Sequence, residues 1–278
     1  MRIGRIPYIN CFPVYGAIDR GLVPLSGEII TGVPSALNAK MAKGELDLSV
    51  VSAVEYARDS ERYLLLPDLA ISCDGPVRSV VLFSHRPAEQ LNGRRVLVSR
   101  SSMTSVALLE LLFEEVWHSR PEFVASDAEL SDITGGEPTE HEARLVIGDA
   151  ALLLSERATS STRPYAHHYD LGQEWKAWTG LPFVFAVWVA QRTCPIAESL
   201  GAHASLIASR DWGLQHLPIL ADQAAQQTGV SAGSCLQYLQ GIDYGLGYPY
   251  LAGLTEFFRR LARTGRAPAA HLSFLPAA

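Results

Sequence analysis

The sequence lacks the signatures of several common classes of functional site. Its 4 cysteines lie far apart, at positions 11, 73, 194 and 235, and no C-x-x-C pair occurs, which excludes zinc-ribbon and thioredoxin-type sites. P-loop and G-x-G-x-x-G patterns are also absent, which argues against phosphate loops and Rossmann fingerprints. One G-x-S-x-G match occurs, at Gly229–Gly233, but it follows no predicted strand and so does not indicate a hydrolase nucleophile elbow. His141-Glu142 lacks the second histidine of a zincin motif. The sequence therefore indicates no metal site and no cofactor.

Long apolar runs and a surplus of basic residues are absent as well. The longest apolar stretch, Phe183–Ala190, is too short to span a bilayer. The N-terminus shows no apolar core of a secretory signal. The formal net charge is −6, from 23 basic and 29 acidic residues, whereas nucleic-acid binders usually carry a basic surplus. We expect a cytoplasmic protein with reduced cysteines that binds neither membrane nor nucleic acid.

What is present is an ordinary globular composition, with 48% hydrophobic and 19% charged residues in 278 positions. Short apolar strands alternate with helical segments as far as residue 190, and the pattern is helical beyond residue 195. This order predicts an α/β fold with mostly parallel sheets. The predicted strands are Arg2–Ile6, Glu28–Thr31, Leu46–Val51, Ser79–Ser84, Arg95–Ser99, Arg144–Gly148 and Phe183–Ala190, and the predicted helices between them are Pro34–Lys43, Thr104–Val116 and Ala150–Glu156.

Two breaks in this pattern indicate where the chain crosses between two lobes. They are the turn-rich loop His85–Gly93 and the segment Thr179–Pro182. We therefore expect residues 1–85 and 188–278 to form one lobe and residues 86–187 to form the other.

Polar residues follow several of the predicted strands, and ligands of open α/β sheets bind beyond the carboxyl ends of strands. Tyr8 and Asn10 follow the first strand, Ser52 follows Leu46–Val51, and Asp149 follows Arg144–Gly148. Each of these residues has an alternative role as a plain turn or cap residue. Their convergence predicts a ligand-binding cleft. Phe185 and Trp188 lie within a strand, where we expect core packing.

The segment 101–105 carries the sharpest local signal, because it opens a predicted helix. First-turn N–H groups lack partners inside a helix, and the helix dipole adds positive potential there. The first acidic residue is Glu110, beyond the first turn, so these groups are available to a ligand carboxylate or phosphate. The alternative is that one serine only caps the helix. The residues predicted to bind the anion are Ser101, Ser102, Thr104 and Ser105.

The sequence also resembles a known family, chorismate dehydratase of the futalosine route to menaquinone. The resemblance extends from the N-terminus to about residue 190. It rests on the blocks Arg5–Pro13, Pro34–Gly44, Arg78–Ser84, Ser101–Val106, Ile147–Leu152, Asp170–Trp175 and Thr179–Phe183.

The resemblance implies a type II periplasmic-binding-protein-like fold, with two α/β lobes around a cleft. It also implies a hydro-lyase that eliminates water from chorismate to give 3-[(1-carboxyvinyl)oxy]benzoate. Asn10 and Ser79 correspond to polar family positions at the substrate ring, and we expect them to be catalytic. We expect the substrate's own enolpyruvyl carboxylate to take the proton. Tyr8, Ser52, Asp149 and the 101–105 segment would bind the substrate.

Two alternatives to this function remain open. One is the later naphthoate-forming synthase of the same pathway, which the N-terminal block disfavours. The other is a cytoplasmic small-anion binding or sensing protein of the same fold, without catalysis.

Overall fold

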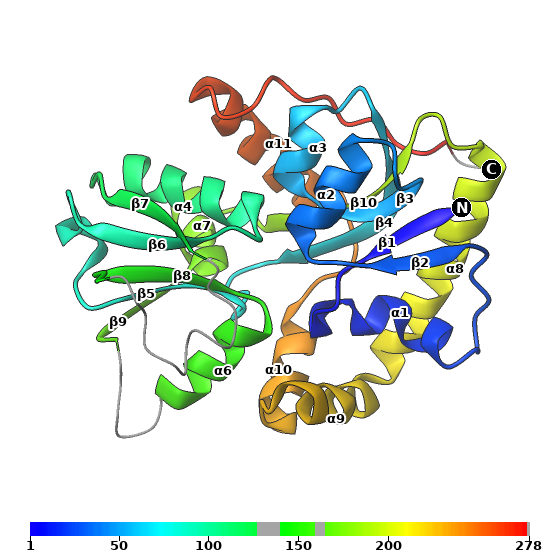
Figure 1. Cartoon of the computed structure of the whole chain (residues 1–278), viewed down its shortest axis with the longest axis horizontal. Coiled ribbons are helices and arrows are strands. Elements are labelled where there is room, and N and C mark those ends of the chain that lie inside the picture. Colours follow the sequence, from blue (N-terminus) through cyan, green and yellow to red (C-terminus); the bar gives the residue numbers. More distant parts are fainter. Residues whose placement is uncertain (127–139, 159–164, 277–278) are drawn as a thin grey trace.

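The strands form two five-stranded sheets that lie side by side and define two lobes (Figure 1). The computed structural model describes residues 1–126, 140–158 and 165–276. The sheet of the first lobe has the order β2-β1-β3-β10-β4, with β1 at Arg2–Arg5, β2 at Glu28–Thr31, β3 at Leu48–Ser52, β4 at Tyr63–Cys73 and β10 at Phe183–Gln191. The sheet of the second lobe has the order β7-β6-β8-β5-β9, with β5 at Val80–Ser84, β6 at Arg95–Ser99, β7 at Glu122–Ser126, β8 at Ala143–Ile147 and β9 at His167–Asp170.

Each sheet contains one reversed strand, and it is the strand that enters from the other lobe. In the first sheet β1 pairs in parallel with β2 and β3, while β10 lies antiparallel between β3 and β4. In the second sheet β6 pairs in parallel with β7 and β8, while β5 lies antiparallel between β8 and β9. All other strands of a sheet therefore point the same way, which confirms the predicted α/β fold with mostly parallel sheets. The carboxyl ends of those strands and the beginnings of β5 and β10 meet at the boundary between the lobes.

Helices cover both faces of each sheet (Figure 1). In this view α2 and α3 lie above the first sheet and α1 and α8 below it, while α4 lies above the second sheet and α6 below it. No helix in the described ranges combines the length and apolar character needed to cross a membrane. The helix bounds are α1 at Phe12–Asp19, α2 at Pro34–Ala42, α3 at Ala53–Arg58, α4 at Met103–Glu115, α6 at Asp149–Ala158, α7 at Leu171–Thr179, α8 at Ile196–Gln215, α9 at Leu217–Thr228, α10 at Ala232–Gly241 and α11 at Tyr248–Arg263, with single 3-10 turns at Ile9–Cys11 and Ala88–Gln90.

The hydrophobic core continues from one lobe into the other along β10. Every residue of β10 is buried. The Trp175 ring of α7 packs edge-on against Phe183 of β10, with the ring centroids 5.1 Å apart, and against Phe257 of α11 at 5.9 Å. Burial of aromatic side chains contributes strongly to core stability. This cluster therefore anchors α11 at the junction of the lobes.

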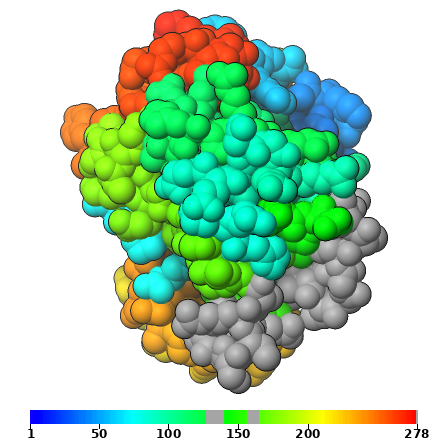
Figure 2. All heavy atoms as spheres, turned by 90° about the vertical axis from the view of Figure 1, so that its left-hand side faces the viewer, coloured from blue at the N-terminus to red at the C-terminus, as the bar shows by residue number. Residues whose placement is uncertain are grey.

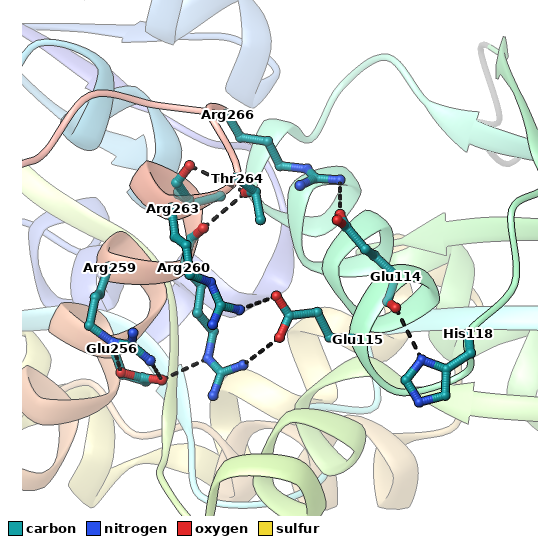
Figure 3. Close-up of polar contacts among 10 residues, drawn as sticks. Glu114, Glu115, His118, Glu256, Arg259, Arg260, Arg263, Thr264 and Arg266 are labelled. Atoms are coloured by element: carbon teal, nitrogen blue, oxygen red, sulfur yellow. Dashed lines mark hydrogen bonds and ion pairs between the residues drawn. The ribbon is translucent and has the colours of Figure 1, made fainter.

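An ionic cluster joins α11 to α4 at the same junction (Figure 3). Arg260 and Arg263 pair with Glu115, and Arg266 pairs with Glu114 at 2.9 Å. The space-filling view of the second lobe shows the C-terminal residues lying directly against α4 (Figure 2). Because Arg260 and Glu115 are only 13% and 23% exposed, these charges are less screened than an isolated surface pair.

Sheet membership places the crossovers slightly earlier than the sequence suggested. The predicted lobe limits were 85/86 and 187/188, yet β5 already belongs to the second sheet and β10 begins in the first sheet at Phe183. The loop His85–Gly93 follows β5 inside the second lobe. The first crossover is instead the turn between β4 and β5, where Gly75 and Arg78 have φ of 114° and 65°. The second crossover falls at residues 180–182, within the predicted break.

Candidate active site

The beginnings of β5 and β10 and the carboxyl ends of several parallel strands enclose one cavity between the lobes. Both lobes contribute to its wall. The cavity is lined by Ile6, Tyr8, Asn10, Pro34, Ser52, Ile71, Val77, Ser79, Val80, Ser102, Ser105, Ile147, Gly148, Phe185 and Ala186.

The structure brings together most of the site residues predicted from the sequence, although it leaves three of them outside the cavity wall. Ser101, Thr104 and Asp149 are the three residues that do not line the cavity. Those that do line it are Tyr8, Asn10, Ser52, Ser79, Ser102 and Ser105.

Ser52 caps α3, and its hydroxyl oxygen is held by two donors. It accepts a hydrogen bond from the Glu55 backbone N–H at 3.2 Å and another from the Asn38 side-chain amide at 3.0 Å. The Asn38 amide oxygen in turn accepts from the Ser52 backbone N–H at 3.2 Å. Because a hydroxyl has two acceptor positions and one hydrogen, Ser52 is left with its hydrogen to donate.

Ser102 and Ser105 form a matching arrangement at the N-terminus of α4. Ser102 Oγ accepts from the Ser105 backbone N–H at 3.3 Å and donates to Ser105 Oγ at 2.7 Å. The Ser105 hydroxyl keeps its own hydrogen for a further partner. The first turn of α4 contains no acidic side chain, so the positive end of the helix dipole is not neutralised locally.

Ser79 lies where the chain enters β5, and its hydroxyl also accepts a hydrogen bond. The donor is the Tyr238 hydroxyl of α10, at 2.9 Å. The Ser79 carbonyl accepts from Gly148 N–H at 2.7 Å. Gly148 has φ of 64°, a conformation that favours glycine, and the Tyr8 ring lies against it.

Thr104 and Asp149 bridge the two lobes instead of facing the cavity. Thr104 Oγ1 accepts from the Val54 backbone N–H at 3.1 Å, and Asp149 Oδ1 accepts from the Ile9 backbone N–H at 3.3 Å. In both bonds the donor lies in the first lobe and the acceptor in the second. These contacts close the cleft, and they place the 3-10 turn that carries Asn10 against α6. Ser101 is half-buried beside the cavity, and its backbone N–H donates to Ser99 Oγ at 3.1 Å.

Burial raises the pKa of Asp149 from 3.8 to about 6, and the hydrogen bond from Ile9 opposes this rise. Asp149 is buried, with an exposed fraction of 8%. A carboxyl whose folded-state pKa is raised contributes stability that is fully present below its unfolded pKa and is lost as the pH rises through the folded value. The protein therefore loses stability at this site as the pH increases from about 4 to about 7.

Replacement of Asp149 by asparagine is expected to remove this pH dependence. The amide stays neutral and keeps an oxygen for the Ile9 N–H, so we expect the variant to be more stable than the parent by about 1–3 kcal/mol at about pH 7.5, with little difference at about pH 4. Thermal unfolding at the two pH values measures the effect. Asp149→Ala, which loses the acceptor for the Ile9 N–H, should be less stable than Asp149→Asn at both pH values. If the stability difference between Asp149→Asn and the parent is the same at both pH values, the raised pKa of Asp149 is contradicted.

The described lining of the cavity offers no ionised side chain. Its polar groups are the hydroxyls of Tyr8 and the serines and the amide of Asn10. Hydroxyl hydrogens and helix N–H groups can hold an anion without a counter-charge, as they do at helix N-termini that bind carboxylates and phosphates. The cavity therefore fits a small anion that also has apolar surface, because aliphatic and aromatic side chains form the rest of the wall.

Three residues that contact the cavity or its serines were not identified from the sequence. Phe185 packs in the core as expected but also lines the cavity, whereas Trp188 is fully buried as expected. Asn38 and Tyr238 lie on helices, and each forms a hydrogen bond with a cavity serine. The block Pro34–Gly44 contains Asn38 and was the available signal for that residue. Tyr238 lies outside the sequence blocks and the strand-end positions that indicated the site.

Comparison with known proteins gives matches over nearly the whole chain. A protein-family model described as menaquinone biosynthesis matches residues 1–263. A chorismate dehydratase of Thermus thermophilus is 32% identical over 268 residues, which are 92% of this chain and 95% of that protein. A chorismate dehydratase of Campylobacter jejuni is 27% identical over 190 residues, or 67% of this chain and 66% of that protein.

Solved structures confirm the fold that the sequence resemblance implied. A protein of Archaeoglobus fulgidus superposes with a TM-score of 0.76 at 18% identity, covering 95% of this chain and 97% of that one. The periplasmic aliphatic sulphonate binding protein of Escherichia coli gives a TM-score of 0.63 at 12% identity over 100% of this chain and 94% of that one. A Candida albicans protein described as having the generic periplasmic binding protein fold gives 0.67 at 13% identity, covering 100% and 98%. At these identities the likeness establishes the fold alone.

Proposed function

The chain belongs to the menaquinone biosynthesis family, and from this we propose that it is a chorismate dehydratase that forms 3-[(1-carboxyvinyl)oxy]benzoate. The observation that carries the proposal is the 32% identity to a chorismate dehydratase over 92% of the chain. The uncharged, donor-lined cavity supports it, because chorismate is a small dicarboxylate with an apolar ring.

The proposed reaction removes one proton and one hydroxyl from neighbouring ring carbons of chorismate. The proton leaves the carbon that bears the enolpyruvyl ether, where it is allylic and conjugated through the diene to the ring carboxylate. Its electron pair forms the new ring double bond as the neighbouring hydroxyl departs, and the two combine as water. The ring becomes aromatic, so the products are strongly favoured. The enzyme needs to hold the substrate in a reactive pose, accept one proton and assist the departing hydroxyl.

The cavity suggests how these tasks are divided. No histidine, lysine or carboxylate lies among the described lining residues, so a protein base is not evident at the cavity wall. We propose that the enolpyruvyl carboxylate of the substrate takes the proton. Ser52, Ser102 and Ser105 would hold the carboxylates with hydroxyl hydrogens and the α4 N-terminus, while Asn10 and Ser79 would orient the ring hydroxyl.

Closure of the lobes would then complete the site. The Thr104–Val54 and Asp149–Ile9 bonds join the lobes beside the cavity, and a closed cleft excludes water from the bound substrate. In this proposal the chain acts in the cytoplasm as a carbon–oxygen lyase of the futalosine route to menaquinone.

The direct test is to mix the purified chain with chorismate, without added cofactor or metal, and to follow the ultraviolet spectrum. We expect an aromatic carboxylate to form and its mass to equal that of chorismate minus one water. A sample without protein controls for spontaneous decay of chorismate. Saturable binding of chorismate with no change in its mass would indicate a binding or sensing protein and would overturn the proposal.

A further inference from the structure

Tyr238 holds the predicted catalytic side chain of Ser79 by a hydrogen bond. It lies on α10 and is 1% exposed, and its hydroxyl donates to Ser79 Oγ at 2.9 Å. A hydroxyl that gives its only hydrogen to Ser79 has its oxygen left to accept a hydrogen bond. Ser79 Oγ accepts the hydrogen bond from Tyr238 and keeps its own hydrogen for another partner.

The side chain of Asn10 lines the same cavity as Ser79. Its amide oxygen is buried and has no hydrogen-bond partner among the described residues. Burial raises the pKa of the Tyr238 hydroxyl, so this group keeps its hydrogen at neutral pH and can donate it to Ser79. The amide oxygen of Asn10 and the hydrogen of the Ser79 hydroxyl are therefore both available to a ligand in the cavity.

We propose that Tyr238 is a positioning residue that fixes the direction of the hydrogen bonds at Ser79. The Tyr238 hydroxyl donates to Ser79 Oγ, so the hydrogen of Ser79 is left for a partner in the cavity. Ser79 thereby acts as a hydrogen-bond donor in the cavity, and the buried amide oxygen of Asn10 acts there as an acceptor. The two together match one ligand hydroxyl, which accepts from Ser79 and donates to Asn10.

This inference rests on the proposed function, since the matching group on chorismate is the ring hydroxyl that departs. A hydrogen bond donated by Ser79 strengthens as negative charge develops on the leaving oxygen. Without the Tyr238 hydroxyl, the Ser79 hydrogen is free to rotate toward other acceptors. The ligand hydroxyl then loses its fixed donor.

Tyr238→Phe is expected to lower kcat for chorismate by about 10- to 100-fold while KM changes by less than about threefold. In a Ser79→Ala background the same change should lower kcat by less than about threefold, because a residue that acts through Ser79 has nothing left to position. Binding of the product, which lacks the ring hydroxyl, should be unaltered in Tyr238→Phe. A kcat equal to that of the parent, or effects that multiply in the double variant, would overturn the proposal.

Tyr244→Phe is the matched control. Tyr244 is also buried, at 2% exposed, and its hydroxyl has no hydrogen-bond partner in the described part of the chain. Removal of an unpaired buried hydroxyl costs little, so kcat and KM should stay at parental values. If Tyr238→Phe does not fold, the Asn10→Ala and Ser79→Ala pair tests whether both side chains bind the same ligand hydroxyl, and additive effects there would refute that arrangement. An inactive parent would refute the proposed function, whereas an active parent with an equally active Tyr238→Phe refutes only the role of Tyr238.

Discussion

Replacement of Asn10 by alanine is expected to lower kcat for chorismate by at least about 100-fold while substrate affinity changes by only a few-fold. The expected size follows from the loss of a preorganised polar group at the reacting atoms, which typically costs 10²–10³ in turnover. Affinity is expected to survive because the groups proposed to hold the carboxylates are Ser52, Ser102 and Ser105, whose hydroxyl hydrogen bonds in the described part of the chain do not involve Asn10. Steady-state kinetics with chorismate, together with equilibrium binding of the product, separate the two effects.

Asn92→Ala serves as the control for this experiment. Asn92 is an exposed residue whose amide oxygen accepts from the Arg120 backbone N–H at 3.2 Å, so its loss tests the general cost of removing a structural asparagine. Its kcat should match that of the parent. The melting temperature of Asn10→Ala should lie close to the parental value, because the buried Asn10 oxygen has no partner to lose among the described residues. Normal turnover in Asn10→Ala would remove this residue from the mechanism.

The sequence predicted the cavity residues that depend on local structure. Asn10, Ser52, Ser102 and Ser105 follow the carboxyl ends of strands, and a parallel sheet brings such positions to one edge. The periodicity of apolar residues is enough to predict alternating strands and helices, so the fold class could be predicted as well. β4 was not predicted, because Pro67-Asp68 interrupts its pattern. Asp68 has φ of 53°, and the pairing of β4 with β10 shifts register along its length.

The sequence did not distinguish residues that face the ligand from residues that close the lobes. Thr104 and Asp149 occupy the same kind of strand-end or helix-start position as Ser105, yet their partners Val54 and Ile9 are 50 and 140 positions away in the sequence. Tyr238 is 159 positions from Ser79. No local pattern encodes contacts at such separations, since they depend on how the two lobes and α10 pack together.

Introduction of a carboxylate at Ser105 is expected to abolish productive substrate binding. Ser105 lines the cavity and is 3% exposed, so the side chain of Ser105→Glu has to lie in the cavity or displace its wall. Two like charges about 4 Å apart repel by about 4 kcal/mol at an effective dielectric constant of about 20. We therefore expect affinity for chorismate to fall by at least about 100-fold. Inhibition by the product, which keeps both carboxylates, should weaken in parallel.

Two further variants separate the effect of charge from the effects of size and of distant electrostatics. Ser105→Gln adds the same bulk without the charge, so the anion-site assignment requires it to bind chorismate more tightly than Ser105→Glu. Ser101→Glu places the same charge four positions earlier at a half-buried residue that does not line the cavity, and it should retain most of the affinity. Burial raises the pKa of an introduced carboxyl, so the gap between Ser105→Glu and Ser105→Gln should narrow as the pH is lowered. Equal affinities for these two variants at neutral pH would mean that no substrate carboxylate lies at the start of α4, and the dianion would then have to bind in the opposite orientation within the cavity.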